Sequence, residues 1–402
     1  MSKSNLNIVF AGHVDHGKST LIGRLLYDTK SLPQSIIDDV EQVSKELGKE
    51  MEFAYLLDSL EEERKDNITI DTTQIFFKTP ERDYTIIDVP GHKEFLKNMI
   101  TGASMAESAL LIVDADEGVQ EQTGRHAYVL NMLGIEQVII VINKMDVVKY
   151  DKNRFETVKN EVLQMFNNLG MTPTRVVPIS ALKGDNVTKK SENIEWAETT
   201  LINALNSLKG KEDLTNKPMR FLVQDVYDNN TLVGRVESGK ISEKEEITIL
   251  PYNMKNKIDK IKVWNQEKNT AKAGENIGII LNNSSKMVRG DVLYTGKKPM
   301  ISDCFETDVF WLSDKPVSVG ESLLWRCATQ EVPCTIKEIK KKIDSSNLKE
   351  LENNNKMEET EVGKLIIQTE KPVVFQKFHD IESLGRFVLV KNDITLAGGV
   401  IT

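Results

Sequence analysis

A glycine, a lysine and a serine near the start of the chain have the spacing of a phosphate-binding loop. Gly12 is followed after four residues by Gly17, Lys18 and Ser19. In such a loop backbone N–H groups surround the phosphates, the lysine neutralises the β and γ oxygens, and the hydroxyl coordinates magnesium. The pattern predicts a nucleotide and Mg²⁺ site whose loop and first helical turn comprise Gly12, His13, Val14, Asp15, His16, Gly17, Lys18, Ser19 and Thr20.

A carboxylate and a glycine further along fit the opposite side of the same site. Asp88 ends the apolar run YTIID, and Gly91 follows three residues later. This arrangement lets a carboxylate reach the magnesium ion while a glycine N–H contacts the γ-phosphate. A helix cap is the alternative role for Asp88. We expect Ser19 and Asp88 to be magnesium ligands.

Polar residues after two further apolar runs predict which base is bound. An aspartate after VIIVI can accept both N–H groups on the pyrimidine edge of guanine, and adenine lacks that pattern. Small residues after VVPI complete the pocket, and we expect the first two of them to point their backbone N–H groups at the guanine oxygen. The chain should therefore bind GTP and GDP rather than ATP, through Asn143, Lys144, Asp146, Ser180, Ala181 and Leu182.

The elements that must position these residues follow from the apolar pattern. From residue 5 to about 208, continuous apolar runs alternate with helical stretches, which predicts a doubly wound, mainly parallel α/β GTPase domain over residues 1–208. Residues 207–218 lack apolar periodicity and are expected to be a linker. The short β-type runs beyond it predict two all-β barrels, residues 217–300 and 301–402.

Composition narrows the class of protein. The chain has 402 residues, too many for one compact core, with 40% hydrophobic and 28% charged residues, as in soluble globular proteins. We expect a cytoplasmic protein, since no apolar run has the length of a signal peptide or membrane span. The net charge of -9 disfavours nucleic acid as a partner, and three cysteines without metal-ligand spacing predict free thiols.

Several motifs together resemble the elongation-factor superfamily of translational GTPases: GHVDHGKST, NITID, DVPGHKEFLKNMITGAS and NKMD. The resemblance implies that Thr69 binds magnesium and the γ-phosphate, and that His92 positions the attacking water. The expected catalytic residues are thus His92, Lys18 and Thr69, and the metal ligands Ser19, Thr69 and Asp88, with Val14 and Ile68 as an apolar gate before the histidine. Asp66, Asn67 and Gly124 depart from the superfamily pattern.

Two functions remain open within that superfamily. One is a carrier of aminoacyl-tRNA or a related decoding factor. The other is suggested by the segment from Thr307 to Glu350, which is similar to the GTP-binding subunit of sulfate adenylyltransferase. That resemblance implies GTP hydrolysis coupled to making adenosine 5'-phosphosulfate from ATP and sulfate, with a smaller ATP-using partner subunit. We favour the second, because residues 301–402 hold 13 Lys or Arg against 17 Asp or Glu, a poor balance for binding tRNA.

Overall fold

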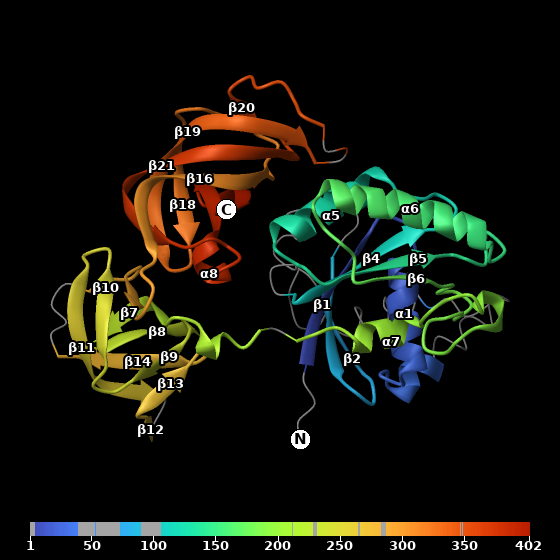
Figure 1. The fold of residues 1–402 in the computed structure, drawn as a ribbon, viewed down its shortest axis with the longest axis horizontal. Coiled ribbons are helices and arrows are strands. Elements are labelled where there is room, and N and C mark those ends of the chain that lie inside the picture. Colours follow the sequence, from blue (N-terminus) through green and yellow to red (C-terminus); the bar gives the residue numbers. More distant parts are fainter. Residues whose placement is uncertain are drawn as a thin grey trace. The chain divides into compact units, whose positions relative to one another are not determined.

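The computed structural model describes residues 5–38, 53, 73–89, 106–210, 212–227, 231–263, 266–282, 287–345, 347 and 349–402. The chain divides into two compact units, Met1–Lys211 and Glu212–Thr402, and Figure 1 shows the fold of each. The first unit is α/β and the second is built almost wholly of strands. This confirms the predicted fold class of a GTPase domain followed by two β-barrels.

A six-stranded sheet forms the centre of the first unit. Its strand order is β2-β3-β1-β4-β5-β6, with β2 antiparallel and the others parallel to their neighbours. Strands β4 and β5 are buried along their whole length, as continuous apolar strands covered on both faces should be. The strands are β1 (Asn5–Gly12), β2 (Thr73–Lys78), β3 (Asp83–Asp88), β4 (Ser108–Asp114), β5 (Val138–Asn143) and β6 (Arg175–Pro178).

Helices cover both faces of this sheet (Figure 1). Helices α1 (Lys18–Asp28) and α7 (Leu201–Asn206) share one apolar core with the sheet, to which Leu21, Leu25 and Leu205 contribute. Helices α5 (Glu121–Met132) and α6 (Lys152–Asn168) lie on the other face. Short 3₁₀ turns, η3 (Glu192–Ile194) and η4 (Leu214–Asn216), complete the connections.

The carboxyl ends of the parallel strands meet at one edge of the sheet. Strands β1, β3, β4 and β5 end at Gly12, Asp88, Asp114 and Asn143. Ligands of open parallel sheets bind in the crevice outside these ends. The fold therefore brings together loops that the sequence separates by more than a hundred residues.

The first barrel of the second unit is closed by a pairing between its ends. Its sheet has the order β10-β15-β7-β8-β14-β11-β12, and β10 also pairs with β11. A small sheet of β9 and β13 lies beside it. The bounds are β7 (Arg220–Tyr227), β8 (Thr231–Ser238), β9 (Lys240–Ser242), β10 (Glu246–Leu250), β11 (Met254–Val263), β12 (Gln266–Glu267), β13 (Thr270–Lys272), β14 (Asn276–Leu281) and β15 (Val292–Tyr294).

The second barrel closes through the last strand of the chain. Its order is β16-β21-β19-β18-β22-β23, and β23 pairs with both β22 and β16. Trp311 and Trp325 are fully buried in its core. The bounds are β16 (Met300–Trp311), β17 (Val317–Ser318), β18 (Ser322–Cys327), β19 (Gln330–Asp344), β20 (Lys356–Met357), β21 (Glu361–Phe375), α8 (Glu382–Gly385), β22 (Arg386–Lys391) and β23 (Ile394–Val400).

A buried arginine joins the two barrels. Arg220 is 1% exposed, and its guanidinium donates to Gln376 Oε1 at 2.6 Å, to the carbonyl oxygen of Met219 at 2.8 Å and to that of Lys297 at 2.5 Å. Burial lowers the pKa of Arg220 to about 10, still far above neutrality. A small apolar cluster that includes Leu222 and residues of the second barrel packs nearby.

Candidate nucleotide site

The predicted phosphate loop connects β1 to α1. Its backbone takes the left-handed conformation at Asp15 (φ 63°) and at Gly17 (φ 88°), which is the residue that precedes α1. Gly17 gives α1 no side-chain cap. The first N–H groups of a helix have no partner within the helix and carry its positive dipole end. The loop therefore offers an anion site of the kind that phosphates occupy.

Close approach of neighbouring atoms requires glycine at two positions of the loop, and at Gly17 the positive φ requires it as well. A Cβ at Gly17 would collide with Nδ2 of Asn143, and one at Gly12 would lie 2.9 Å from the carbonyl oxygen of Ile112. Real Cβ atoms essentially never lie within 3.0 Å of such atoms, so a side chain at either glycine would force its neighbours to shift. The loop is therefore packed directly against β4 and the end of β5.

Lys18 and Asp88, the predicted phosphate-binding cation and magnesium ligand, are in direct contact. Lys18 Nζ and Asp88 Oδ1 form an ion pair, and each side chain is 13% exposed. Ser19 and Thr20 lie half-buried on the first turn of α1. The fold thus places an ammonium group, a carboxylate and a hydroxyl at the mouth of one loop, and the two oxygen donors are of the type that Mg²⁺ prefers.

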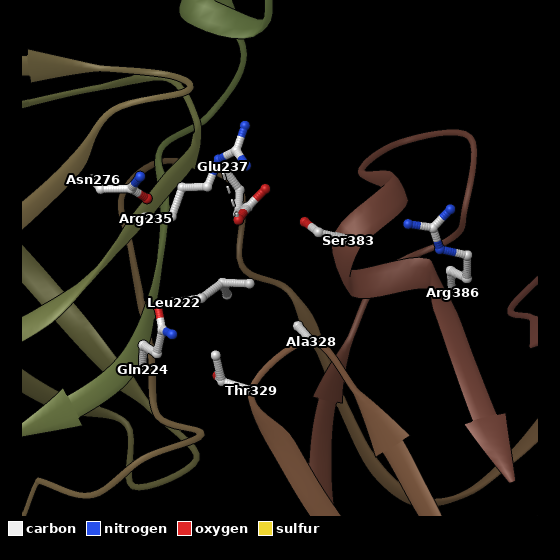
Figure 2. Close-up of a pocket in the computed structure, with 9 residues that line it drawn as sticks. All are labelled: Leu222, Gln224, Arg235, Glu237, Asn276, Ala328, Thr329, Ser383 and Arg386. Atoms are coloured by element: carbon white, nitrogen blue, oxygen red, sulfur yellow. Dashed lines mark ion pairs between the residues drawn. The ribbon is translucent and has the colours of Figure 1, made fainter. Parts of the chain in front are cut away.

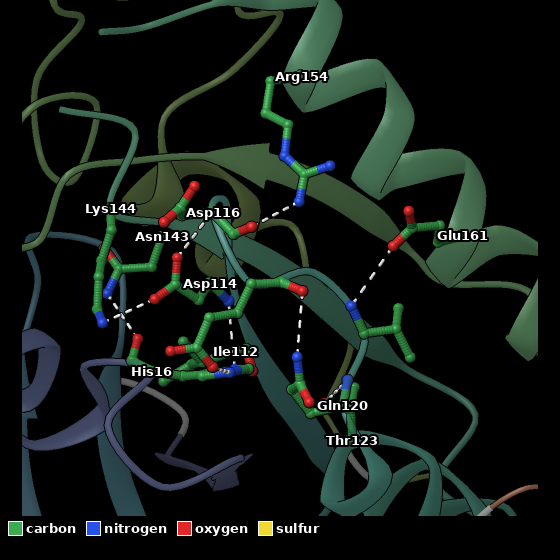
Figure 3. Close-up of polar contacts among 12 residues, drawn as sticks. His16, Ile112, Asp114, Asp116, Gln120, Thr123, Asn143, Lys144, Arg154 and Glu161 are labelled. Atoms are coloured by element: carbon green, nitrogen blue, oxygen red, sulfur yellow. Dashed lines mark hydrogen bonds and ion pairs between the residues drawn. The ribbon is translucent and has the colours of Figure 1, made fainter. Parts of the chain in front are cut away.

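His16 is a buried support of the loop. It is 0% exposed, and its Nδ1 lies 3.2 Å from the backbone N of Asp114, while its Nε2 lies 3.3 Å from Glu117 Oε2 (Figure 3). Nδ1 also lies 3.4 Å from the carbonyl oxygen of Ile112, so this nitrogen faces both a backbone donor and a backbone acceptor of β4. Burial lowers the pKa of His16. His16 therefore connects the loop to β4 and to Glu117.

Asn143 ties three loops together. Its Nδ2 donates to the carbonyl oxygen of His16 and its Oδ1 accepts from the N–H of Ala181, each at 2.9 Å. Ser180 N–H donates to the carbonyl oxygen of Asp185 at 3.1 Å. The two amides that we expected to face a guanine oxygen thus bond within the protein instead. The structure thus places this loop beside Asn143, and the role of Ser180 and Ala181 in binding guanine stays a prediction.

The other residues of the predicted base pocket lie around Asn143. Lys144 takes the left-handed conformation (φ 59°), and its Nζ lies 2.7 Å from the buried carboxylate of Asp114 (Figure 3). Asp146 is half-buried, while the apolar side chains of Val147 and Leu182 are 56% and 42% exposed. Apolar groups exposed beside a half-buried carboxylate suit a flat base with one polar edge.

Two residues that sequence reasoning missed connect the base loops on their outer side. Tyr150 donates its hydroxyl to Asp185 Oδ2 at 2.6 Å. Asp185 Oδ1 also accepts from Ser191 Oγ at 2.5 Å and lies 3.3 Å from Asn193 Nδ2. The available signal was the Gly-Asp-Asn turn at 184–186, which marks a polar loop but not its partner.

His126 is fully buried in α5 near the phosphate loop. Its two ring nitrogens have no hydrogen-bond partner among the described residues. Burial, with help from the positive charge of Lys18, lowers its pKa to about 3. The imidazole is therefore neutral at every physiological pH.

Part of the predicted site lies outside the described residues. Thr69, Gly91 and His92, and with them Ile68, Asp66 and Asn67, belong to that part of the chain. Their predicted roles stay predictions. Gly124 is described, and it is buried within α5 beside Arg125, which forms an ion pair with Glu121.

A second polar feature lies between the two barrels. A cavity of about 330 Å³ is bounded by β7 and β8 on one side and by α8 and the loop at Ala328 on the other (Figure 2). Arg235 Nε and Glu237 Oε1 lie 3.9 Å apart on its wall. The residues that line this cavity lie far from the P-loop in the sequence, and none of them is a predicted site residue.

Two negative findings apply to the described residues. No helix there is long and apolar enough to cross a membrane. No group of three or more His, Cys, Asp or Glu side chains gathers there as metal ligands would.

Comparison with known proteins covers the whole chain. Family models match as elongation factor Tu GTP binding domain over residues 3–211, elongation factor Tu domain 2 over 230–294, and GTP-eEF1A C-terminal domain-like over 304–402. Elongation factor 1-alpha of Pyrococcus furiosus is 40% identical over 418 positions, covering 99% of this chain and 97% of that protein. Those of Methanoculleus marisnigri and Methanopyrus kandleri are each 38% identical, with the same coverage of both chains.

These relatives contradict the prediction of a sulfate adenylyltransferase subunit and of its smaller ATP-using partner. The segment that suggested it includes Trp311 and Trp325, which are core residues of the second barrel. Such residues report how a barrel packs, and the fold of a barrel does not determine what it binds. The count of charged residues was a poor guide to function, because it sums over residues 301–402 and does not show where on the surface the charges lie. With its first half matched to the elongation factor Tu GTP binding domain and its full length to elongation factor 1-alpha, the chain belongs to the elongation factor Tu and 1-alpha family of three-domain GTPases.

Proposed function

We propose that this chain is a translational GTPase that, with GTP bound, carries aminoacyl-tRNA to the ribosome. The observation that carries the proposal is the similarity to elongation factor 1-alpha across both barrels as well as the nucleotide domain. A chain that shared only the nucleotide switch would match in its first half alone.

The phosphates would bind at the start of α1. The first N–H groups of α1 and the ammonium of Lys18 would hold the phosphates, since α1 begins just after the loop that follows β1. Gly17 leaves room for the loop to pack on Asn143. When a nucleotide is present, Lys18 would exchange its ion pair with Asp88 for the phosphates.

The residues present fit a magnesium ion. The Ser19 hydroxyl and the Asp88 carboxylate are hard oxygen ligands beside the predicted phosphate position. When bound, Mg²⁺ supplies positive charge to the β and γ oxygens. Thr69 is the further ligand that the family resemblance implies.

Guanine would be recognised by Asp146 between the exposed side chains of Val147 and Leu182. The Asn143 side chain holds both neighbouring loops at fixed separation from the phosphate loop. Hydrolysis would rely on His92 to orient water, and on Lys18 to stabilise the charge that develops on the phosphate oxygens.

The test is a pair of assays with the purified chain. The first measures whether GTP, but not GDP, lets the chain protect aminoacyl-tRNA from hydrolysis of its ester bond. The second measures whether programmed ribosomes accelerate GTP hydrolysis in the presence of that tRNA. We expect both effects, with deacylated tRNA as the control that gives neither.

Tight GTP binding with no protection of aminoacyl-tRNA would overturn the carrier function and leave the nucleotide site intact. Failure to bind GTP or GDP would overturn the nucleotide assignment itself. The two results are distinguishable in a single preparation by fluorescent GDP binding.

A further inference from the structure

The two loops that would read the base lie on neighbouring parallel strands and leave them in the same direction. One follows β5 and contains Asp146, and the other follows β6 and contains Ala181. Asn143 fixes both loops on the side of the phosphates. On the outer side the same two loops are joined again, by Tyr150 and Asp185.

The backbone is bent to bring Tyr150 into that position. Lys149 and Tyr150 both take the left-handed conformation, with φ of 53° and 58°. This conformation costs a residue with a Cβ roughly 1 kcal/mol or more. Tyr150 N–H donates to the carbonyl oxygen of Met145 at 2.7 Å and so closes the turn around Asp146. The Met145 side chain is fully buried.

Asp185 is also held in place, by contacts within its own loop. Ser180 and Asp185 face each other in an antiparallel bridge, and Gly184 N–H donates to the Ser180 carbonyl oxygen at 2.8 Å. Its carboxylate then accepts from Ser191 Oγ at 2.5 Å with one oxygen and from Tyr150 at 2.6 Å with the other. Both ends of the Tyr150 to Asp185 bond are therefore held by their own loops.

We propose that Tyr150 and Asp185 form a positioning pair that holds the two base loops at the separation guanine requires, and so sets guanine specificity and the lifetime of bound GDP. The inference rests on the proposed function, since it assigns these residues to the nucleotide site of a GTPase. Tyr150 touches neither phosphate nor metal ligand. It acts by keeping the turn that carries Asp146 against the loop that carries Ala181.

The protonation state of Tyr150 agrees with this role. Burial and the hydrogen bond to Asp185 raise the pKa of Tyr150 above its ordinary value. The phenol therefore keeps its proton and remains a donor to the carboxylate over the range in which proteins of this kind function.

The variant Tyr150→Phe removes one hydroxyl and keeps the ring. We expect it to release GDP roughly 10- to 150-fold faster, the effect of losing one hydrogen bond to a charged group. Release of inosine diphosphate, which lacks the 2-amino group of guanine, should rise less, so the ratio of the GDP release rate to the inosine diphosphate release rate should rise. Stopped-flow fluorescence with labelled nucleotides measures both.

A matched control lies in the same unit. Tyr84 is 1% exposed and donates its hydroxyl to Asn206 Oδ1 at 2.6 Å, the same length as the Tyr150 bond, on β3 away from the base loops. Tyr84→Phe should lower the unfolding temperature while leaving GDP release and the ratio of GDP to inosine diphosphate release unchanged.

Asp185→Asn gives an independent test if Tyr150→Phe does not fold. It should also speed GDP release, and the double variant should be no worse than the more affected single variant, since the two residues act through one bond. Wild-type release rates and ratio in Tyr150→Phe, or an equal rise in Tyr84→Phe, would overturn the proposal. A wild-type chain that binds no guanine nucleotide would instead overturn the proposed function on which it rests.

Discussion

Asn143 Nδ2 lies 2.9 Å from the carbonyl oxygen of His16, so the base loop and the phosphate loop are joined by one side chain. We expect Asn143→Ala to weaken GDP binding by about 10- to 100-fold, because it leaves the buried His16 carbonyl oxygen and Ala181 N–H without partners. Isothermal titration measures the change.

Asn131 provides the control for that variant. Its Nδ2 donates to the carbonyl oxygen of Leu169 at 3.0 Å, between the ends of α5 and α6. Asn131→Ala should reduce stability slightly and leave GDP affinity unchanged. Equal losses of affinity in both variants would mean that the whole domain loosens rather than the site.

Gly17 is expected to tolerate no side chain. Gly17→Ala combines a positive φ of 88° with a collision at Asn143, so we expect GDP affinity to fall at least ~10-fold along with a lower unfolding temperature. Gly170→Ala separates the two effects, because Gly170 has a φ of 70° but nothing within 4 Å of the added carbon. It should lower the unfolding temperature alone.

Asp146 should determine the choice of base. Asp146→Asn exchanges an acceptor for a donor, and we expect binding to shift from guanine towards xanthine nucleotides. Competition of GDP and xanthosine diphosphate against a fluorescent nucleotide measures the shift. Unchanged GDP affinity would show that another group reads this edge of the base.

His126 should make the nucleotide domain sensitive to acid. Its folded pKa of about 3 lies below the ordinary value of 6.5, so between these values the unfolded chain binds a proton that the folded chain does not. Stability therefore falls as the pH drops through that window, by up to about 1.4 kcal/mol per pH unit.

Replacing His126 with leucine should remove that slope. From pH 7 to pH 5 we expect the wild type to lose roughly 2 kcal/mol more than His126→Leu, measured by urea unfolding at each pH. If the stability of the two chains changed with pH in the same way, the charged ring of His126 would have to gain a hydrogen-bond acceptor in the folded state.

Arg220 should be essential to the junction of the barrels. Arg220→Met leaves Gln376 Oε1 and several carbonyl oxygens without a donor, and we expect a loss of about 3 kcal/mol or more in calorimetry. Arg220→Lys should not rescue it, since one ammonium cannot reach acceptors that the planar guanidinium spans. Arg326→Met is the control, because Arg326 pairs with Glu331 on the surface and its loss should barely move the midpoint.

The sequence was sufficient to predict the fold class. Continuous apolar runs predicted β4 and β5, and the spacing of Gly12, Lys18 and Asn143 located the loops after the strands. The sequence could not predict the contacts between loops. The partner of Tyr150 is 35 residues away in the chain and comes close to it only when β5 and β6 pair. The wrong metabolic assignment has the same origin, because barrel core residues specify packing and leave the bound partner open.

The place of β23 in the second barrel bears on how the chain is made. Residues 394–400 lie between β16 and β22 and pair with both, so the barrel is closed by the last of its own strands to be synthesised. Until then β16 and β22 present unpaired edges, which are templates for aggregation. The nucleotide domain has no such delay, because all six strands of its sheet precede residue 179. During synthesis the first unit can therefore be folded while the last barrel still has these two strand edges unpaired.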